Sequence, residues 1–418
     1  MSAERLFSYE QAKAIWYNQI TKLNIQPRLH WQGHTGRQTA FCYLEHQGEC
    51  IAKGVGKGLT QEQIELSACY EALEHCFSAH HLSKRNIILD TISNISKQYQ
   101  TTVFRSLPSL LKSKSKQVLP WVIVTEYKSK ESYAVPLATL DTKYPFNRLA
   151  EDKFDYCQHR LYASTNGLAA SASYDEALLH AISEIIERDA ISYFLLDTFL
   201  LKQSINIISQ TSLPEYLQTL IKQIESLYNN KVLLIQLPSR YNVPVYCAVL
   251  TEPGEFSKIP AKGFGASLNA HYAAERAILE ALQTLHVYEC MPEERVNLAT
   301  TATRDYPVLF DCLRFNVMEL INANQFQLID FAETSCHLMN LPLTGYLQVL
   351  IDKIYQHHPI ILIDNIITSD DGFSCINVII PGTEEFFHVF NEYIVLPQEQ
   401  TKMYIQHRLR SSEKVQVS

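Results

Sequence analysis

The chain has 418 residues, of which 46% are hydrophobic and 19% charged, so it is long enough for one large domain or two and is not disordered. Its formal net charge of −8 argues against a dedicated nucleic-acid-binding protein, which usually carries a basic surplus. No apolar run approaches the ~18 residues of a membrane helix, and the N-terminal MSAERLFSYEQAK lacks the apolar core of a signal peptide, so we expect a cytoplasmic protein with no membrane or nucleic-acid partner.

Hydrophobic periodicity and turn residues predict a series of helices and strands. In chain order they are a helix over 8–24 with Ser8 as its N-cap, two strands around a turn within 39–53, a helix over 61–78, an exposed loop at 111–118, strands at 120–127 and 132–140, a helix over 173–195, strands at 231–238 and 243–251, a helix over 270–288, and a strand pair at 360–366 and 374–382. Their irregular alternation favours an α+β or mixed α/β fold over a regular βαβ winding.

The cysteines are scattered and form no CxxC pair. This pattern predicts reduced thiols and argues against a structural zinc site, which needs paired ligand spacings. Cys69 and Cys76 lie on the apolar side of the helix over 61–78, so we expect both in the core.

The helix over 173–195 carries a stripe of charged residues opposite an apolar face. At about 100° per residue, Glu176, His180, Glu184, Glu187 and Arg188 fall within about 120° of one another. Taken alone, such a stripe is typical of a solvated helix surface.

The same pattern recurs in two other predicted helices, as X-x3-E-x2-[E/Q]. Its members are Ser67, Glu71 and Glu74, with His75 at the margin; His180, Glu184 and Glu187; and Arg276, Glu280 and Gln283. The stripes lack the lysines that usually pair with glutamate at i,i+4 on solvated helices. If the three stripes converge, their mutual repulsion requires cations, and Mg²⁺ with a nucleotide phosphate suits clustered carboxylates.

Two glycine-containing segments do not match the known phosphate-binding motifs. GVGKG (54–58) lacks the Walker spacing and the Ser or Thr after Lys57, and GFGAS (263–267) lacks the third glycine of the dinucleotide fingerprint. A nucleotide would therefore be bound through metal and carboxylate instead of a glycine cradle.

The segment TNGLAASASYDEALLHAISEIIERDA (165–190) resembles the core signature of the YcaO superfamily, ATP-dependent enzymes that activate peptide backbone amides. The resemblance extends in order through GKGLTQEQIELSACYEALEH (56–75), AAERAILEALQ (273–283) and INVIIPG (376–382). It implies β-sheets packed with helices around a central carboxylate-rich ATP and Mg²⁺ site. We expect an N-terminal helical segment at 1–38, the catalytic domain at 39–390 and a tail at 391–418.

The resemblance also implies which residues bind the cofactors, without identifying a catalytic side chain. The predicted Mg²⁺ ligands are Glu71, Glu74, Glu176, Glu184, Glu187 and Glu280; Arg188 and Arg276 would offset phosphate charge, and Lys57 and Gln283 complete the nucleotide set. The chain departs from the family pattern at Ala169 and Ala172, where Ser and Asn are common, and at His75, where Arg is common. We expect activity because the carboxylate set is intact.

The chemistry that the resemblance implies is nucleophilic addition to a backbone amide followed by phosphorylation of its oxygen. We expect cyclodehydration of Cys, Ser or Thr to azolines in a ribosomally made peptide. A thioamide-forming or amidine-forming enzyme, or a non-catalytic ATP-binding scaffold for a partner enzyme, are the alternatives. The ending RLRSSEKVQVS lacks the proline-rich tail of many azoline-forming members, which shifts weight towards other products.

The expected partners are a precursor peptide or protein and a separate peptide-recruiting protein, E1-like or TfuA-like, because no fused domain with zinc cysteines is apparent. The resemblance is also compatible with a homodimer. The remaining polar clusters, RLHWQGHTGR (28–37), His80–His81 and His357–His358, are expected to be surface features, the first of them a turn.

Overall fold

The computed structural model describes residues 4–80, 85–101, 114–157, 164–252, 259–290, 303, 305–332, 341–386, 389–390, 393–398, 401–406 and 408. The chain divides into two compact units, each built from two chain segments. Unit 1 comprises Met1–Leu73 and Asp189–Tyr346, and unit 2 comprises Glu74–Arg188 and Leu347–Ser418. Helices α2 (Gln61–His80), α6 (Tyr174–Leu195) and α13 (Leu343–Tyr355) each begin in one unit and end in the other.

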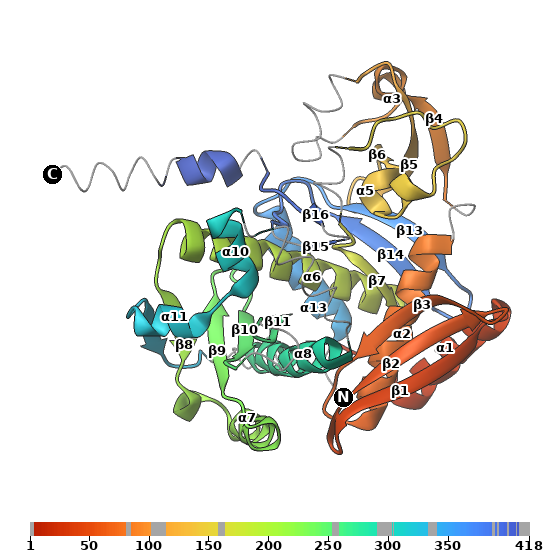
Figure 1. Cartoon of the computed structure of the whole chain (residues 1–418). Coiled ribbons are helices and arrows are strands. Elements are labelled where there is room, and N and C mark those ends of the chain that lie inside the picture. Colours follow the sequence, from red (N-terminus) through yellow and green to blue (C-terminus); the bar gives the residue numbers. More distant parts are fainter. Residues whose placement is uncertain are drawn as a thin grey trace. The chain divides into compact units, whose positions relative to one another are not determined.

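The first sheet of unit 1 is an antiparallel meander in the order β1 (Gln26–His34), β2 (Arg37–His46) and β3 (Glu49–Gly56) (Figure 1). It follows α1 (Tyr9–Lys22), where Ser8 and Gln11 form a capping box that satisfies the first N–H groups. The Trp16 indole on α1 donates to the carbonyl oxygen of Cys69 on α2 at 2.8 Å. A buried indole N–H thus fixes the two helices relative to each other.

The second sheet of unit 1 has the order β11 (Lys262–Ala266), β10 (Val245–Leu250), β9 (Val232–Leu237), β8 (Ile205–Ile208) and β12 (Phe326–Ile329). Only the β8–β12 pair is parallel. Helix α8 (Ala270–Cys290) packs on β10 and β11 and against α7 (Glu215–Tyr228). The unit also contains the π-helix η4 (Leu196–Leu200), the 3-10 helix η5 (Gln210–Ser212), α10 (Pro307–Arg314) and α11 (Val317–Asn322).

Helix α7 shows why this layer forms. Leu217, Leu220, Ile221 and Ile224 recur at helical spacing and are all buried in one cluster with the apolar face of α8. Fully burying each such side chain contributes about 1.5–3 kcal/mol relative to leaving it exposed.

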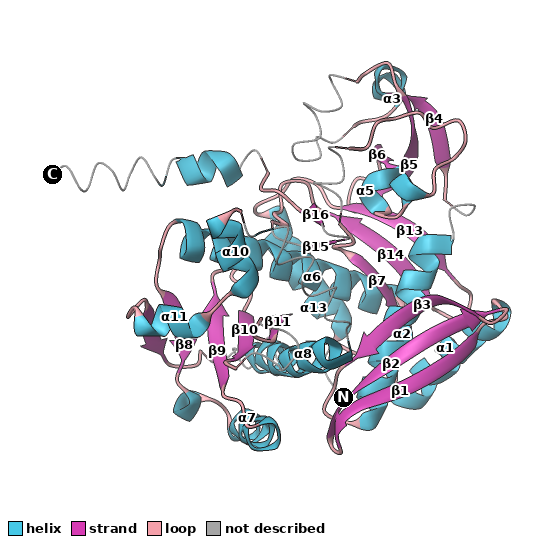
Figure 2. Ribbon diagram, in the orientation of Figure 1, coloured by secondary structure: helices cyan, strands magenta, loops and turns pink. Residues whose placement is uncertain are grey.

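Unit 2 is built on an antiparallel sheet in the order β4 (Ile87–Thr91), β5 (Val118–Glu126), β13 (Leu362–Thr368), β14 (Ser374–Ile379) and β7 (Leu168–Ser171), with β6 (Ser132–Pro136) also paired to β5 (Figure 2). Strand β14 is buried along its whole length. Shorter elements are α3 (Ile92–Gln98), α5 (Leu137–Leu140), the 3-10 helix η2 (Tyr144–Phe146) and the hairpin of β15 (Val389–Phe390) and β16 (Tyr393–Ile394).

The mixed α+β class and the predicted helices agree with the structure. The four helices predicted over 8–24, 61–78, 173–195 and 270–288 are α1, α2, α6 and α8, and the strand pair near the end of the chain is β13 and β14. Cys69 and Cys76 are buried as predicted, and the nine described cysteines are free thiols. No helix in the described part of the chain is long and apolar enough to cross a bilayer.

Three local predictions are wrong. The segment 28–37 is not simply a turn, because its residues up to His34 belong to β1 and pair with β2. The strand predicted over 132–140 ends at Pro136, after which α5 begins. His358 is not at the surface: it is 5% exposed, and its ring Nδ1 lies 3.0 Å from the Pro381 carbonyl oxygen. His357 is exposed as expected; the His80 and His81 side chains and residues 111–113 of the predicted loop lie outside the described residues.

Candidate functional site

The three helices with the repeated acidic pattern begin in the same way. Each starts with a side-chain cap eleven residues before its first patterned glutamate. The capping oxygens belong to Thr60, Ser173 and Asn269, which accept the N–H groups of Gln63, Glu176 and His271 at 3.3, 3.2 and 3.0 Å. Because the caps fix where the helices begin, Glu71, Glu184 and Glu280 fall at equivalent positions.

Each of these helices is preceded by an edge strand that contains or follows a glycine. β3, β7 and β11 are the terminal strands of their sheets, and Gly54, Gly167 and Gly263 lie 17 residues before Glu71, Glu184 and Glu280. An edge strand carries backbone groups with no strand to pair with, so other groups must satisfy them. In this molecule the patterned side chains of the helices do so.

In unit 2, three carboxylates accept hydrogen bonds from β7 or from the residue before it. Glu184 accepts from the Gly167 N–H at 3.3 Å, and Glu74 accepts from the Ala170 N–H at 3.3 Å. Glu176 accepts from the Ser171 hydroxyl at 3.1 Å. These contacts bring residues of α2 and α6 to one four-residue strand and hold one oxygen of each carboxylate in place.

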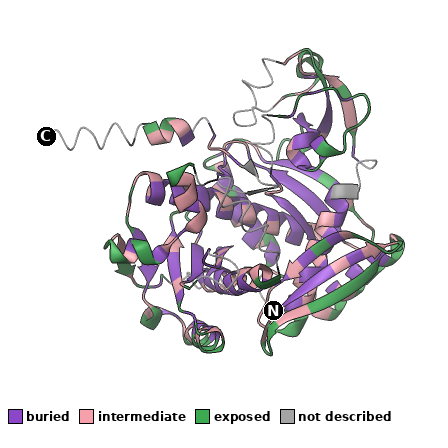
Figure 3. Cartoon of the chain, viewed as in Figure 1, coloured by how far each residue is buried: buried purple, intermediate pink, exposed green. Residues whose placement is uncertain are grey.

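The acidic face of α6 is not a solvated surface. Glu176 and Glu187 are 5% and 4% exposed, and no residue of α6 is classed as exposed (Figure 3). Arg188 lies 3.9 Å from Glu184, and each of these side chains is about one-quarter exposed, at 27% and 25%. Buried carboxylates are costly unless cations or hydrogen bonds compensate them, so this face is suited to binding a cation.

In unit 1, β11 and β3 supply the corresponding contacts. Glu280 accepts from the Phe264 N–H at 3.3 Å and forms an ion pair with Lys57 at 2.5 Å. The Gln283 side chain donates to the Val55 carbonyl oxygen at 2.5 Å. Lys57 and Gln283 therefore do lie with Glu280, although the glycine motif around Lys57 has no Walker spacing.

Glu4 is a neighbour of the predicted phosphate-binding residues that the sequence did not reveal. It accepts from the Ser267 hydroxyl at 2.6 Å, and Ser267 lies 2.7 Å from the Tyr346 hydroxyl. Burial raises the pKa of Glu4, while the Ser267 hydrogen bond and the charge of Arg276 oppose the rise. The charge of Arg276 therefore already acts on one carboxylate within unit 1.

The departures at Ala169 and Ala172 are visible as buried methyl groups. Ala169 is fully buried in β7 opposite Ile376, and Ala172 is 2% exposed. Neither side chain can donate or accept a hydrogen bond, so these two positions contribute apolar packing alone.

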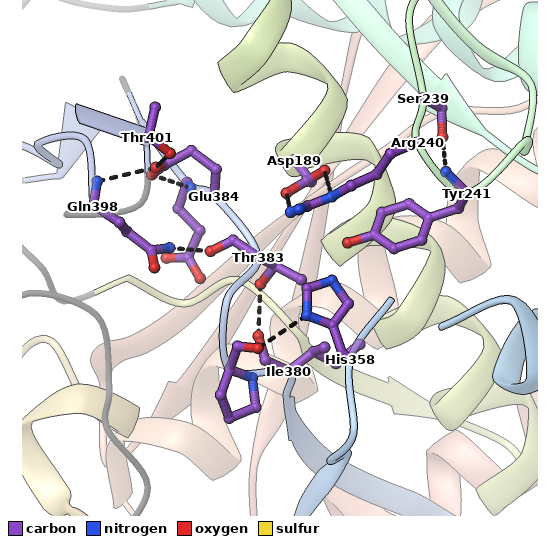
Figure 4. A network of polar contacts seen from close by, with 12 residues as sticks. Asp189, Ser239, Arg240, Tyr241, His358, Ile380, Thr383, Glu384, Gln398 and Thr401 are labelled. Carbon is purple, nitrogen blue, oxygen red and sulfur yellow. Dashed lines mark hydrogen bonds and ion pairs between the residues drawn. The ribbon is translucent and has the colours of Figure 1, made fainter. Parts of the chain in front are cut away.

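The part of α6 that follows Arg188 is fixed separately within unit 1. Asp189 is 1% exposed and binds Arg240 through both carboxylate oxygens, next to Tyr241 (Figure 4). This bidentate ion pair fixes the helix at the residue after Arg188.

The donor set fits a hard divalent cation, because it consists of carboxylate oxygens held by backbone N–H groups and a hydroxyl. Among the described residues, no group of three or more His, Cys, Asp or Glu side chains is arranged to hold a metal ion. The six-carboxylate metal set and the ten nucleotide residues therefore stay predictions. The structure divides the ten by chain segment: Lys57, Glu71, Arg276, Glu280 and Gln283 belong to unit 1, and Glu74, Glu176, Glu184, Glu187 and Arg188 to unit 2.

A protein-family model described as YcaO cyclodehydratase, ATP- and Mg²⁺-binding, matches residues 55–384, which is more than half of the chain. The cofactors of that family are the two predicted from the sequence. No curated protein matches the chain significantly.

The fold is similar to several solved structures. YcaO from Methanopyrus kandleri, bound with AMPPCP and Mg²⁺, is 18% identical, with 91% of this chain and 92% of that chain covered and a TM-score of 0.63. A heterocyclase in complex with substrate and cofactor is 17% identical with a TM-score of 0.66, covering 91% of this chain and 53% of that one. The Escherichia coli microcin synthetase McbBCD complex with pro-MccB17 is 12% identical, covering 86% and 89%, with a TM-score of 0.57.

Proposed function

Because the chain belongs to the YcaO family, we propose that it is an ATP-dependent enzyme that modifies a backbone amide of a peptide or protein. The observation that carries the proposal is the set of hydrogen bonds that glutamates of the patterned helices accept from edge strands. Glu74 and Glu184 bind backbone N–H groups of β7 or the residue before it, and Glu280 binds β11 in the same way. Carboxylates held in this manner are preorganised, so a cation can bind them without their having to reorient.

The side chains divide into two roles in this proposal. The six glutamates named above hold Mg²⁺, and Arg188, Arg276 and Lys57 offset the charge of the ATP phosphates. The ion pair of Lys57 with Glu280 supports a position for Lys57 near these carboxylates. When bound, Mg²⁺–ATP supplies the phosphoryl group that turns the amide oxygen into a leaving group.

We propose cyclodehydration as the reaction. The side-chain sulfur or oxygen of a Cys, Ser or Thr adds to the preceding carbonyl, whose oxygen departs as phosphate. The balance is loss of one water from the peptide and conversion of ATP to ADP and phosphate. The description of the matching family model as a cyclodehydratase supports this reaction. A precursor peptide and a separate recruiting protein are the proposed partners.

A non-catalytic ATP-binding scaffold is the second candidate, and the methyl groups of Ala169 and Ala172 favour it. The two candidates differ in peptide-stimulated ATP turnover. The purified chain, with a Cys-containing precursor peptide, ATP and Mg²⁺, should release phosphate, and the peptide mass should fall by one water. With sulfide added to the same assay, exchange of one oxygen for sulfur would identify the thioamide reaction, and absence of stimulated turnover both with and without sulfide would favour the scaffold.

Glu187→Gln should lower ATP turnover by at least about 100-fold while leaving the fold intact, because it removes one buried negative charge and keeps the side-chain shape. Phosphate release and circular dichroism measure the two effects. Glu215→Gln, on the exposed side of α7, is the matched control and should keep full turnover. Unchanged turnover in Glu187→Gln would show that this part of α6 is not at the nucleotide site.

A further inference from the structure

The strand that carries most of the RLHWQGHTGR segment, β1, has no part in the proposed function. It is a terminal strand of the first sheet in unit 1, and seven of its nine residues are exposed, while Trp31 and Gln32 are half-buried (Figure 3). At the other edge of this sheet, the Gln283 side chain satisfies the Val55 carbonyl oxygen of β3. The two edges therefore differ, and only β1 faces solvent along its length.

The hairpin of β1 and β2 shows which backbone groups of β1 point outwards. His34 pairs with Arg37 across a two-residue turn, and the closing pair of such a hairpin hydrogen-bonds within the ladder. Counting back from His34 in steps of two, alternate residues bond to β2, and the N–H and C=O groups between them point away from it. The outward groups belong to Pro27, Leu29 and Trp31. Pro27 agrees with this count, because a strand accepts proline where the ladder needs no N–H.

Residues 28–31 lack the features that usually protect an edge strand, which are short length, a bulge, proline or a charge that reaches across the edge. β1 pairs with β2 over nine residues without a register shift. The Arg28 Nε–H donates to Glu45 on β2 at 2.9 Å, and the guanidinium lies 4.4 Å from the centre of the Tyr43 ring, so its charge is held over the sheet. In the described part of the chain, no hydrogen bond reaches the outward groups of Leu29 or Trp31.

The side chains beside this edge favour one kind of strand as its neighbour. Leu29 and Trp31 lie on one face of the sheet, where Leu29 is 37% exposed, and Arg28 and His30 lie on the other face. Glu45 uses only the Nε–H of Arg28, and the two terminal nitrogens have no hydrogen-bond partner among the described residues. β1 contains no Asp or Glu. A strand that alternates apolar with acidic residues therefore complements both faces.

We propose that β1 is a docking site for an extended segment of a partner polypeptide, which pairs antiparallel with residues 28–31. Apolar residues of the segment lie opposite Leu29 and Trp31, and acidic residues lie opposite Arg28 and His30. In an antiparallel pair, the residues opposite Leu29 and Trp31 exchange both backbone hydrogen bonds with them. The apolar residues of the segment thus supply the backbone bonds, and the N–H groups of its acidic residues point to solvent. The assignment does not depend on nucleotide binding.

The test is a ligand-observed NMR titration of the full chain, without ATP, with N-acetyl Val-Glu-Val-Glu-Val amide. The chain should bind this peptide at least about tenfold more tightly than the analogue with Lys in place of Glu. N-methylation of the valine amides should abolish binding, and N-methylation of the glutamate amides should leave the affinity within about twofold. No binding of the parent peptide, equal binding of the Lys analogue, or equal or reversed effects of the two methylations would overturn the assignment.

Variants of β1 test the position of the site. Leu29→Pro removes an outward N–H but no bond to β2, and should weaken peptide binding about tenfold, with thermal unfolding as the check that it folds. His30→Glu places a carboxylate at the same edge, and should weaken binding of the Glu peptide and strengthen binding of the Lys analogue. His357→Glu, at an exposed histidine in unit 2, is the matched control and should change neither. Equal affinities in His30→Glu and His357→Glu would refute the site.

A second copy of the chain is the competing occupant of this edge. Sedimentation velocity should give the same oligomeric state for the wild type and for Leu29→Pro, because the proposed occupant is a different polypeptide. A wild-type dimer that Leu29→Pro converts to a monomer would place the β1 strand of a second copy on the edge and would overturn the assignment.

Discussion

At the scale of single residues, buried polar side chains in unit 1 depend on partners from distant parts of the chain. His286 on α8 is fully buried, its Nε2 lies 2.7 Å from the Tyr228 hydroxyl, and its Nδ1 lies 2.8 Å from the Thr39 hydroxyl. Burial, with a smaller contribution from His34, lowers the pKa of His286 to about 4. The imidazole is therefore neutral in the folded protein at physiological pH.

This residue should make the protein acid-sensitive. The pKa of His286 in the folded chain is below the ordinary value of about 6.5. The contribution of the neutral imidazole to the free energy of unfolding is therefore complete above pH 6.5 and is lost as the pH falls towards 4. The shift corresponds to about 3 kcal/mol of unfolding free energy. Urea unfolding at pH 7 and pH 4 should show a smaller pH-dependent loss in His286→Gln than in wild type.

The exposed His30 on β1 provides the control, since His30→Gln should lose stability between pH 7 and pH 4 as wild type does. Identical pH dependence in wild type and His286→Gln would contradict the assignment of a buried neutral imidazole.

At the scale of elements, the contact between an edge strand and its helix is a backbone contact made possible by glycine. A Cβ on Gly263 would lie 2.1 Å from the Ala281 nitrogen and 2.4 Å from the Ala277 carbonyl oxygen, and a Cβ on Gly54 would lie 2.3 Å from the Ala72 nitrogen. The strand can therefore approach the helix closely enough for Glu280 to reach the Phe264 N–H.

Gly263→Ala should destabilise the protein by about 1–3 kcal/mol and weaken Mg²⁺–ATP binding, because the added methyl group pushes β11 away from α8. Thermal unfolding and nucleotide titration measure the two effects.

The control substitution is Gly345→Ala in α13, where the nearest atoms to a Cβ are 3.5 Å away. It should be neutral or stabilising by about 0.5–1 kcal/mol, because alanine is the better helix former. Similar effects of the two substitutions would contradict a close strand–helix contact at Gly263.

At the scale of the whole molecule, each unit contains its own sheets and its own half of the predicted nucleotide residues. In unit 1, Gln283 hydrogen-bonds to the backbone of β3 and Glu280 to the backbone of β11. In unit 2, Glu74 and Glu184 accept N–H groups of β7 and of the residue before it. A ligand that binds only the folded chain stabilises it by mass action.

Mg²⁺–ATP at 100 times its dissociation constant should therefore stabilise the folded chain by about 2.7 kcal/mol, seen as a rise in the thermal midpoint. Removing the metal with EDTA should abolish the rise. The unit 1 variant Lys57→Ala and the unit 2 variant Glu187→Gln should each reduce it, while Glu215→Gln should not. A rise that survives both site variants would place the nucleotide elsewhere.

Local sequence determined the helices, their caps and the acidic pattern, because these depend on residues within a few turns of one another. Ser8, the stripe on α6 and the burial of Cys69 and Cys76 were all predictable in this way. The spacing of 17 residues from Gly54, Gly167 and Gly263 to the glutamates was also present in the sequence, and it could have revealed the strand–helix repeat.

Tertiary structure alone decided which backbone groups these glutamates bind. Glu74 and Ala170 are far apart in the chain, as are Ser164 and Glu385, so no local periodicity connects them. The pairing of 28–34 as β1 and the burial of His358 depend on such distant contacts too. The acidic stripes could be recognised in the sequence. Their burial could not, because the unpaired N–H groups of the edge strands reach these glutamates only in the folded chain.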